Sequence, residues 1–217
     1  MRRFVGLVLC AALAVTSCTG GGAENPQADD ENPCRVADSS NEERLLRALL
    51  GGGSVETIVY NTPMDVGARL RKNLLGSGGA KATPYVYGCS FAQDSRLDDG
   101  EIRLGFSWVS RDDPYEKEKS PSPSRRFDVS GTLGESGGNY SKLYLRCDLP
   151  GDLGPPSERV LLRARASNTS NSEQKGSEEA MKQHLAFLYL MTQRVTAALA
   201  CENKPLQGDP VVKPVKG

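Results

Sequence analysis

The sequence predicts an α+β fold, in which an antiparallel sheet of about five or six strands packs against a long C-terminal helix and one or two short N-terminal helices. Two patterns predict it. Between residues 83 and 166, apolar and polar residues alternate along several short segments, which is typical of strands with one face toward solvent. After residue 177 the apolar residues recur every three or four positions, as in an amphipathic helix.

The first part of the predicted domain contains two short helices and a strand. Ser40 and Glu43 have the spacing of a capping box, which predicts that a helix begins there. Thr62, followed by Pro63, has the pattern of an N-cap with proline in the first helical turn. Residues 54–60 are rich in β-branched side chains and follow a run of glycines, so we expect a strand between the two helices.

The period of two begins near Thr83 and defines the remaining strands. The segments that carry it are residues 85–89, 102–108, 127–133, 140–147 and 160–166. Trp108, Phe106, Tyr85 and Tyr87 form an aromatic group on neighbouring strands. We expect these rings to form the core beneath the long helix, and the alternative is a ligand-binding platform.

The long helix is expected to begin at Ser177, an N-cap residue followed by Glu178 and Glu179 in the first turn. Its apolar stripe consists of Met181, Leu185, Leu188, Thr192, Val195 and Leu199. A helix with so broad an apolar face must cover another apolar surface. We expect that surface to be the face of the sheet that points away from solvent. Beyond it, residues 204–217 are expected to be a mobile, Pro-rich tail.

The N-terminus has the organisation of an export signal. Arg2 and Arg3 precede an apolar run over residues 4–15, which is too short to cross a bilayer as a helix. The run ends in Val15-Thr16-Ser17-Cys18, which resembles the lipobox of bacterial lipoproteins. That resemblance implies a lipid on the Cys18 thiol and cleavage before this residue, so that two or three acyl chains anchor the protein to the membrane.

These features divide the chain into four parts. Residues 1–17 are expected to be a lipoprotein signal peptide, and residues 18–33 are expected to contain the lipidated Cys18 and a flexible tether rich in Gly, Pro, Asn and acidic residues. Residues 34–203 are the expected globular domain with two disulfides. Residues 204–217 are the expected tail.

The cysteines indicate an oxidising compartment. If Cys10 leaves with the signal and Cys18 carries lipid, an even number remains: Cys34, Cys89, Cys147 and Cys201. Four cysteines allow three pairings, between which the sequence does not choose. We favour Cys34 with Cys89 and Cys147 with Cys201, since each pair closes a loop within one half of the chain.

Charge and residue spacing argue against several partners. The chain has 27 basic and 27 acidic side chains, so no dominant positive field attracts nucleic acid, and nucleic acid is not an expected partner. The four remaining cysteines form no C-x-x-C pair, and the only histidine, His184, is distant from them in sequence. We therefore expect neither a metal site nor a cofactor.

No catalytic residue is assigned. Residues 134–138 match the G-x-S-x-G string of hydrolases, but a strand follows where that motif needs a helix, so we interpret Ser136 as part of a hairpin loop. His184 is expected to lie at the surface or core edge of its helix, unsuited to a Ser-His-Asp site. Whether the protein is an enzyme stays open at this point, and a non-enzymatic role is favoured.

The whole chain resembles the uncharacterised surface lipoproteins of actinobacteria such as Streptomyces, through its lipobox, acidic Gly-rich tether, four later cysteines and Cys201-Glu202-Asn203 after the last helix. The resemblance implies anchoring at the outer face of the cell membrane. We expect a binding or accessory module whose partners are membrane lipid, through the acylated N-terminus, and an envelope protein or polymer. The alternatives are a secreted hydrolase that uses carboxylates and a small solute-binding lipoprotein.

Overall fold

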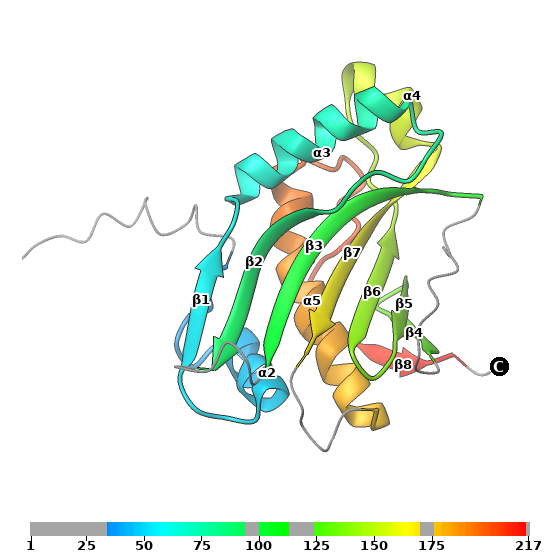
Figure 1. Ribbon diagram of the computed structural model, residues 1–217. Helices are drawn as coiled ribbons and strands as arrows, with labels where there is room; N and C mark the ends of the chain where they lie inside the picture. The colour runs from blue at the N-terminus through cyan, green and yellow to red at the C-terminus, as the bar shows by residue number, and fades with distance from the viewer. Residues whose placement is uncertain (1–33, 94–99, 113–123, 170–175, 216–217) are drawn as a thin grey trace, which may run out of the picture.

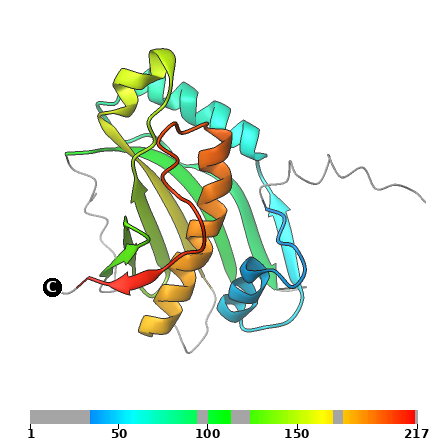
Figure 2. The ribbon, with the colours of Figure 1, turned by 180° about the vertical axis from the view of Figure 1, so that it is seen from behind.

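A computed structural model describes residues 34–93, 100–112, 124–169 and 176–215 and has the α+β fold expected from the sequence. One antiparallel sheet contains eight strands in the order β1-β2-β3-β7-β6-β5-β4-β8 (Figure 1). The helices pack on one face of this sheet, and α5 runs diagonally across it (Figure 2). Within the described residues, the other face carries no helix, and this asymmetry positions the candidate site.

The strands are β1 (Val55–Val59), β2 (Val86–Gln93), β3 (Glu101–Ser110), β4 (Arg125–Val129), β5 (Thr132–Ser136), β6 (Tyr140–Leu145), β7 (Val160–Asn168) and β8 (Val212–Pro214). The helices are α2 (Asn41–Leu50), α3 (Pro63–Ser77), α4 (Gly154–Ser157) and α5 (Glu178–Ala198), with a 3-10 turn, η1, at Gly151–Leu153. The expected membrane-linked Cys18 and its tether lie outside the described residues.

The sheet has eight strands, so the expectation of five or six was too low. Residues 127–133, expected as one strand, contain a tight turn at Ser130 and Gly131, whose φ angles are 51° and 81°. Positive φ at both central residues is typical of a two-residue hairpin turn. The segment therefore divides into β4 and β5. The eighth strand, β8, lies in the segment expected to be a mobile tail and pairs with β4.

Side-chain caps explain where the helices begin. Ser40 Oγ accepts a hydrogen bond from Glu43 N (3.1 Å) at the start of α2, as its spacing predicted. Thr62 and Asp65 form a reciprocal capping box at the start of α3. Ser177 Oγ accepts from Ala180 N (3.1 Å) and begins α5. Each cap satisfies backbone N–H groups that have no partner within the helix.

The core lies between the sheet and the helices. Trp108 and Phe106 point into it from β3 and are almost completely buried, as expected. Trp108 also donates a hydrogen bond from Nε1 to the carbonyl of Leu70 (2.9 Å), so its polar group is satisfied inside the core and ties α3 to the sheet. Phe91 and Phe187 pack edge to face, with ring centroids 5.5 Å apart, between β2 and α5.

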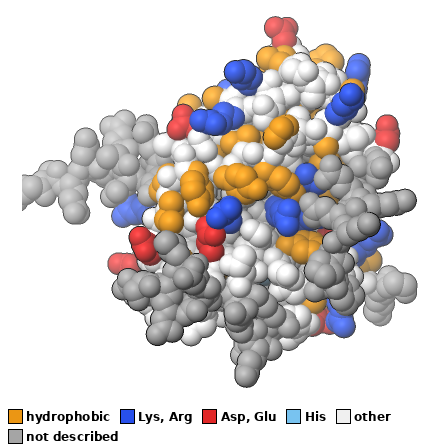
Figure 3. All heavy atoms as spheres, in the orientation of Figure 1, with side chains coloured by type: hydrophobic (Ala, Val, Ile, Leu, Met, Phe, Trp, Pro, Cys, Tyr) orange, Lys and Arg blue, Asp and Glu red, His pale blue; other side chains and the backbone are white. Residues whose placement is uncertain are grey.

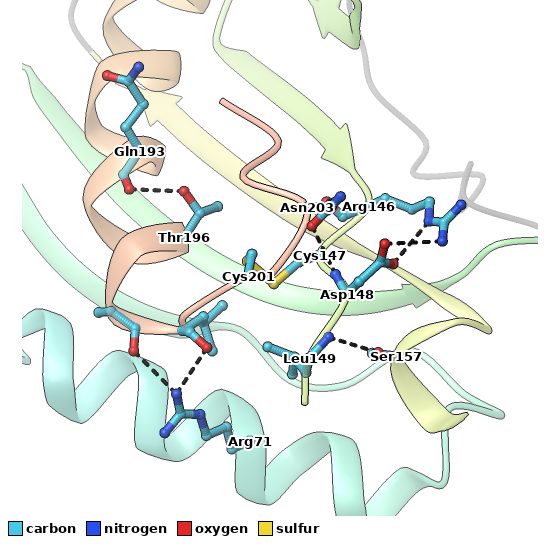
Figure 4. The surroundings of a disulfide bond; sticks show 12 residues. Arg71, Arg146, Cys147, Asp148, Leu149, Ser157, Gln193, Thr196, Cys201 and Asn203 are labelled. Atoms are coloured by element: carbon cyan, nitrogen blue, oxygen red, sulfur yellow. Dashed lines mark hydrogen bonds and ion pairs between the residues drawn. A yellow bond between two sulfur atoms is a disulfide. The ribbon is translucent and has the colours of Figure 1, made fainter. Parts of the chain in front are cut away.

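The C-terminal end of α5 is fixed from two sides (Figure 4). Arg71 of α3 donates to the carbonyls of Ala198 (3.4 Å) and Leu199 (2.9 Å), which otherwise lack partners at a helix end. Gly67 of α3 packs beside the same helix end, where a Cβ would lie 3.4 Å from the Ala198 carbonyl oxygen. A disulfide then joins the segment after α5 to the segment after β6.

Two disulfides join Cys34 to Cys89 and Cys147 to Cys201, with sequence separations of 55 and 54 residues. These are the pairs that we favoured from the sequence. The first fastens the start of the described chain to β2, and the second fastens the end of α5 beside β6. Buried disulfides of this kind are consistent with an extracytoplasmic location, because the cytosol keeps most thiols reduced.

Candidate functional site

The face of the sheet that no described helix covers is rich in tyrosine and basic residues. Strand register places side chains from β1 to β6 on this face, opposite the helices. Five of the seven tyrosines of the chain belong to it. We call it the tyrosine–arginine face, and its members are Tyr60, Tyr85, Tyr87, Tyr140, Tyr144, Arg103, Lys142, Arg163 and Arg165. In the space-filling view, apolar and aromatic side chains form a band across this face, with basic side chains along its borders (Figure 3).

The structure therefore divides the aromatic group that the sequence placed in the core. Trp108 and Phe106 are in the core, but Tyr85 and Tyr87 lie on the opposite face. Alternation also suggested that Tyr87 and Cys89 share a face, which is wrong. The register between β2 and β3 shifts between Tyr87 and Ser90, and such a bulge adds one residue and reverses the direction of those that follow.

Basic groups and rings alternate across the face. The Arg103 guanidinium lies 5.9 Å from the ring centroid of Tyr60 and 5.8 Å from that of Tyr87. Farther along, the Arg163 guanidinium lies 4.6 Å from the ring of Tyr85. Contacts of this kind continue to β6, where Arg165 and Lys142 approach Tyr140 at 6.0 and 4.8 Å. These cation–π contacts hold the long basic side chains against the sheet.

A carboxylate organises each end of this arrangement. Glu101 accepts hydrogen bonds from Arg103 (2.8 Å) and from the Tyr60 hydroxyl (3.4 Å). Burial raises the pKa of Glu101, but hydrogen bonds from Ser90 and Arg103 outweigh this effect, so its pKa lies below the ordinary value. The carboxylate stays charged and fixes the position of Arg103.

At the other end, Glu135 of β5 accepts hydrogen bonds from two tyrosines of β6. The Tyr140 hydroxyl donates to Oε1 (3.2 Å), and the Tyr144 hydroxyl donates to Oε2 (3.3 Å). Burial, together with the nearby Glu135 charge, raises the pKa of Tyr144 above its ordinary value. Tyr144 therefore stays protonated and keeps donating this hydrogen bond.

A groove opens where α3 passes the end of this face near β1, β2 and β3. Its volume is about 860 Å³, within the range of ligand sites in proteins. We call it the α3 groove, and its lining residues are Tyr60, Asn61, Arg69, Lys72, Asn73, Tyr85, Val86, Tyr87 and Arg103. Tyr60 and Tyr87 are 44% and 43% exposed, so their rings are accessible to a ligand.

The groove is positively charged. Arg69, Lys72 and Arg103 contribute three cations, and no carboxylate is among its described lining residues. Glu101 neutralises Arg103 through the ion pair described above. Within the described chain, Arg69 and Lys72 form no ion pair, so their two charges are available to an anion.

The residues considered for catalysis occupy other places. Ser136 is fully buried on the helix side of β5, where its Oγ lies 2.7 Å from the Oγ of Ser141. His184 is 4% exposed, which is more deeply buried than the surface or core-edge position expected, and burial lowers its pKa to about 4. Among the described residues, no cluster of three or more His, Cys, Asp or Glu side chains could hold a metal ion. The described segments also contain no helix that could cross a membrane.

Sequence reasoning identified only part of the candidate site. It named Tyr85 and Tyr87 as a possible platform but did not name the basic residues beside them. The signal was present in β7, where Arg163 and Arg165 alternate with the core residues Leu162 and Ala164. Comparisons with protein-family models, with curated proteins and with solved structures gave no match. The site is therefore interpreted from its own geometry.

Proposed function

We propose that this protein is a lipid-anchored extracytoplasmic binding module that recognises its ligand with the tyrosine–arginine face. The observation that supports this most directly is the groove beside exposed rings and basic groups, on the sheet face where the described chain has no helix. Tyrosine and arginine are enriched where proteins bind partners, because both combine an apolar surface with polar groups.

The position of the site fits a tethered module. A lipid on Cys18 and a tether through residue 33 would hold the domain roughly 20 Å from the membrane, within reach of envelope components. Cys34, the first described residue, is joined by its disulfide to Cys89 of β2, on the same strand as Tyr87 of the groove. The expected partner is therefore an envelope polymer or protein.

Site-specific photo-crosslinking tests this function. A photoreactive amino acid replaces Tyr87, on the tyrosine–arginine face, in the lipidated protein expressed in an actinobacterial host. The control replaces Ala197, which is exposed on α5 on the opposite side of the sheet. We expect an adduct with an envelope component from position 87 alone. Equal adducts from both positions, or adducts from position 197 alone, would contradict the proposal.

Lipidation is tested separately by mass spectrometry of the protein extracted from its membrane. We expect an N-terminal Cys18 that carries acyl chains, and we expect a Cys18→Ala variant to leave the membrane fraction. An unmodified thiol at residue 18 in the extracted protein would refute the anchor while leaving the binding face unaffected.

A further inference from the structure

The α3 groove offers two kinds of recognition side by side, and we infer that its ligand is a phosphate-bearing saccharide. This inference rests on the proposed function and names the ligand class of the same site. It follows from the charge of the groove, from its exposed rings and from its volume.

The charge favours an anion. Arg69 and Lys72 line the same groove from α3, and neither forms an ion pair within the described chain. Arg103 lines it from β3, where Glu101 and two tyrosine rings restrict its position. A guanidinium and an ammonium that share one groove suit a phosphate, whose several oxygens accept hydrogen bonds from more than one donor.

The rings favour a ligand with an apolar face and a polar rim. Tyr85 and Tyr87 lie with ring centroids 6.2 Å apart, and the Arg103 guanidinium lies 5.9 Å from the Tyr60 ring and 5.8 Å from the Tyr87 ring. A sugar ring presents C–H groups on its faces and hydroxyls at its edge, which match the faces and hydroxyl groups of tyrosines. The amide of Asn73 also lines the groove and provides a donor and an acceptor for hydroxyl groups.

The shape favours a saccharide over a free anion or a flat surface. A volume of about 860 Å³ is much larger than a phosphate ion needs, so charge alone would leave most of the groove empty. A bilayer surface is flat and cannot fill a hollow between α3 and the sheet. Sugar units that carry phosphate would place their rings on Tyr60 and Tyr87 and their charge near Arg69 and Lys72.

Binding measurements with defined probes test this inference. The full lipidated protein, purified in detergent, is titrated with phosphorylated dextran, unmodified dextran, carboxymethyl dextran and inorganic polyphosphate. We expect the tightest binding to phosphorylated dextran. The double variant Arg69→Gln and Lys72→Gln should weaken this binding by about tenfold or more, because it removes two charge-assisted contacts.

Matched variants separate the groove from general charge. Arg44→Gln with Lys213→Gln removes the same two types of cation from exposed positions on α2 and β8, and we expect binding to change by less than about twofold. Tyr87→Ala should weaken binding of phosphorylated dextran about fivefold and change polyphosphate binding by less than about twofold, since Glu101 still holds Arg103. Thermal unfolding of each variant shows whether the domain still folds.

Three results would overturn the inference. The first is equal affinity for polyphosphate and phosphorylated dextran, which would mean that the groove recognises charge alone. The second is equal loss of affinity in the groove variant and the control variant. The third is displacement of phosphorylated dextran by phosphatidylglycerol micelles at equal phosphate concentration, which would assign the groove to a lipid headgroup. Crosslinking from position 87 without dextran binding would leave the proposed function standing and reject only the saccharide.

Discussion

Gly105 of β3 lies directly beneath the ring of Tyr87, its cross-strand partner on β2. A Cβ at Gly105 would come within 3.2 Å of ring atoms of both Tyr85 and Tyr87. The absence of a side chain therefore lets two rings rest on the strand backbone. Glycine in the interior of a strand weakens the strand, so a compensating role such as this one explains its presence.

Substitution of Gly105 by alanine should displace both rings. We expect the free energy of unfolding to fall by about 1 kcal/mol, because overpacking outweighs the gain in strand propensity. The tyrosine bands of the near-ultraviolet circular dichroism spectrum should also change. Chemical denaturation and circular dichroism measure the two effects.

Gly88→Ala is the matched control, in the neighbouring strand. A Cβ there would lie 3.6 Å from Phe106, an ordinary contact distance, so we expect less than half the loss seen at Gly105. Equal effects at the two glycines would show that Gly105 has no special relationship with the rings.

The sequence predicted the elements of the fold better than it predicted their faces. Caps at Ser40, Thr62 and Ser177 identified the helix starts, because capping depends on residues close in sequence. Alternation identified strands but could not show that the bulge after Tyr87 turns Cys89 toward the core. A bulge depends on the partner strand, which a local pattern does not contain.

The candidate site was harder to predict for the same reason. Tyr60 follows β1, Arg103 lies on β3 and Arg69 lies on α3. Only strand pairing and helix packing bring these three residues to one groove. Strand β8 was missed because its Pro-rich sequence is unsuited to a central strand, whereas the structure places it at the sheet edge, where proline is tolerated.

Arg71 should stabilise the domain through the end of α5. Its guanidinium donates to two carbonyls at the C-terminal end of α5, where the partial negative charge of the helix dipole lies. We expect Arg71→Met, which keeps the apolar stem, to lower the free energy of unfolding by about 1–2 kcal/mol. Arg69→Met, on the same helix and exposed, should change it by less than about 0.5 kcal/mol. Urea denaturation compares the two variants, and equal losses would argue against the capping role.

The disulfide between Cys147 and Cys201 should contribute most of its stabilisation through the unfolded state. It closes a loop with a sequence separation of 54 residues, for which chain entropy gives about 4 kcal/mol. We expect the double variant Cys147→Ala and Cys201→Ala to lose roughly that much in equilibrium denaturation. A thiol reductant is then added to the variant and to the natural chain. If it lowers the free energy of unfolding of both by the same amount, the Cys34–Cys89 disulfide alone accounts for the response to reductant.

His184 should make the stability of the domain depend on pH. It is the only histidine of the chain, and burial lowers its pKa from 6.5 to about 4. Between these values the unfolded chain binds a proton that the folded chain does not, so the free energy of unfolding falls as pH falls. We expect a loss of about 2 kcal/mol between about pH 7.5 and pH 5, measured by denaturation at each pH.

The variant His184→Leu separates this effect from the titration of carboxylates. Glu43, Glu101 and Glu178 have pKa values below their ordinary value of 4.5, so the stability that they contribute is lost only as pH falls below about that value. Leucine has a similar volume and does not titrate, so the variant should have nearly constant stability down to about pH 5. If the variant keeps the slope of the natural chain, the proton is bound elsewhere. A slope that disappears would identify the buried His184 imidazole as the group whose protonation destabilises the domain between about pH 7.5 and pH 5.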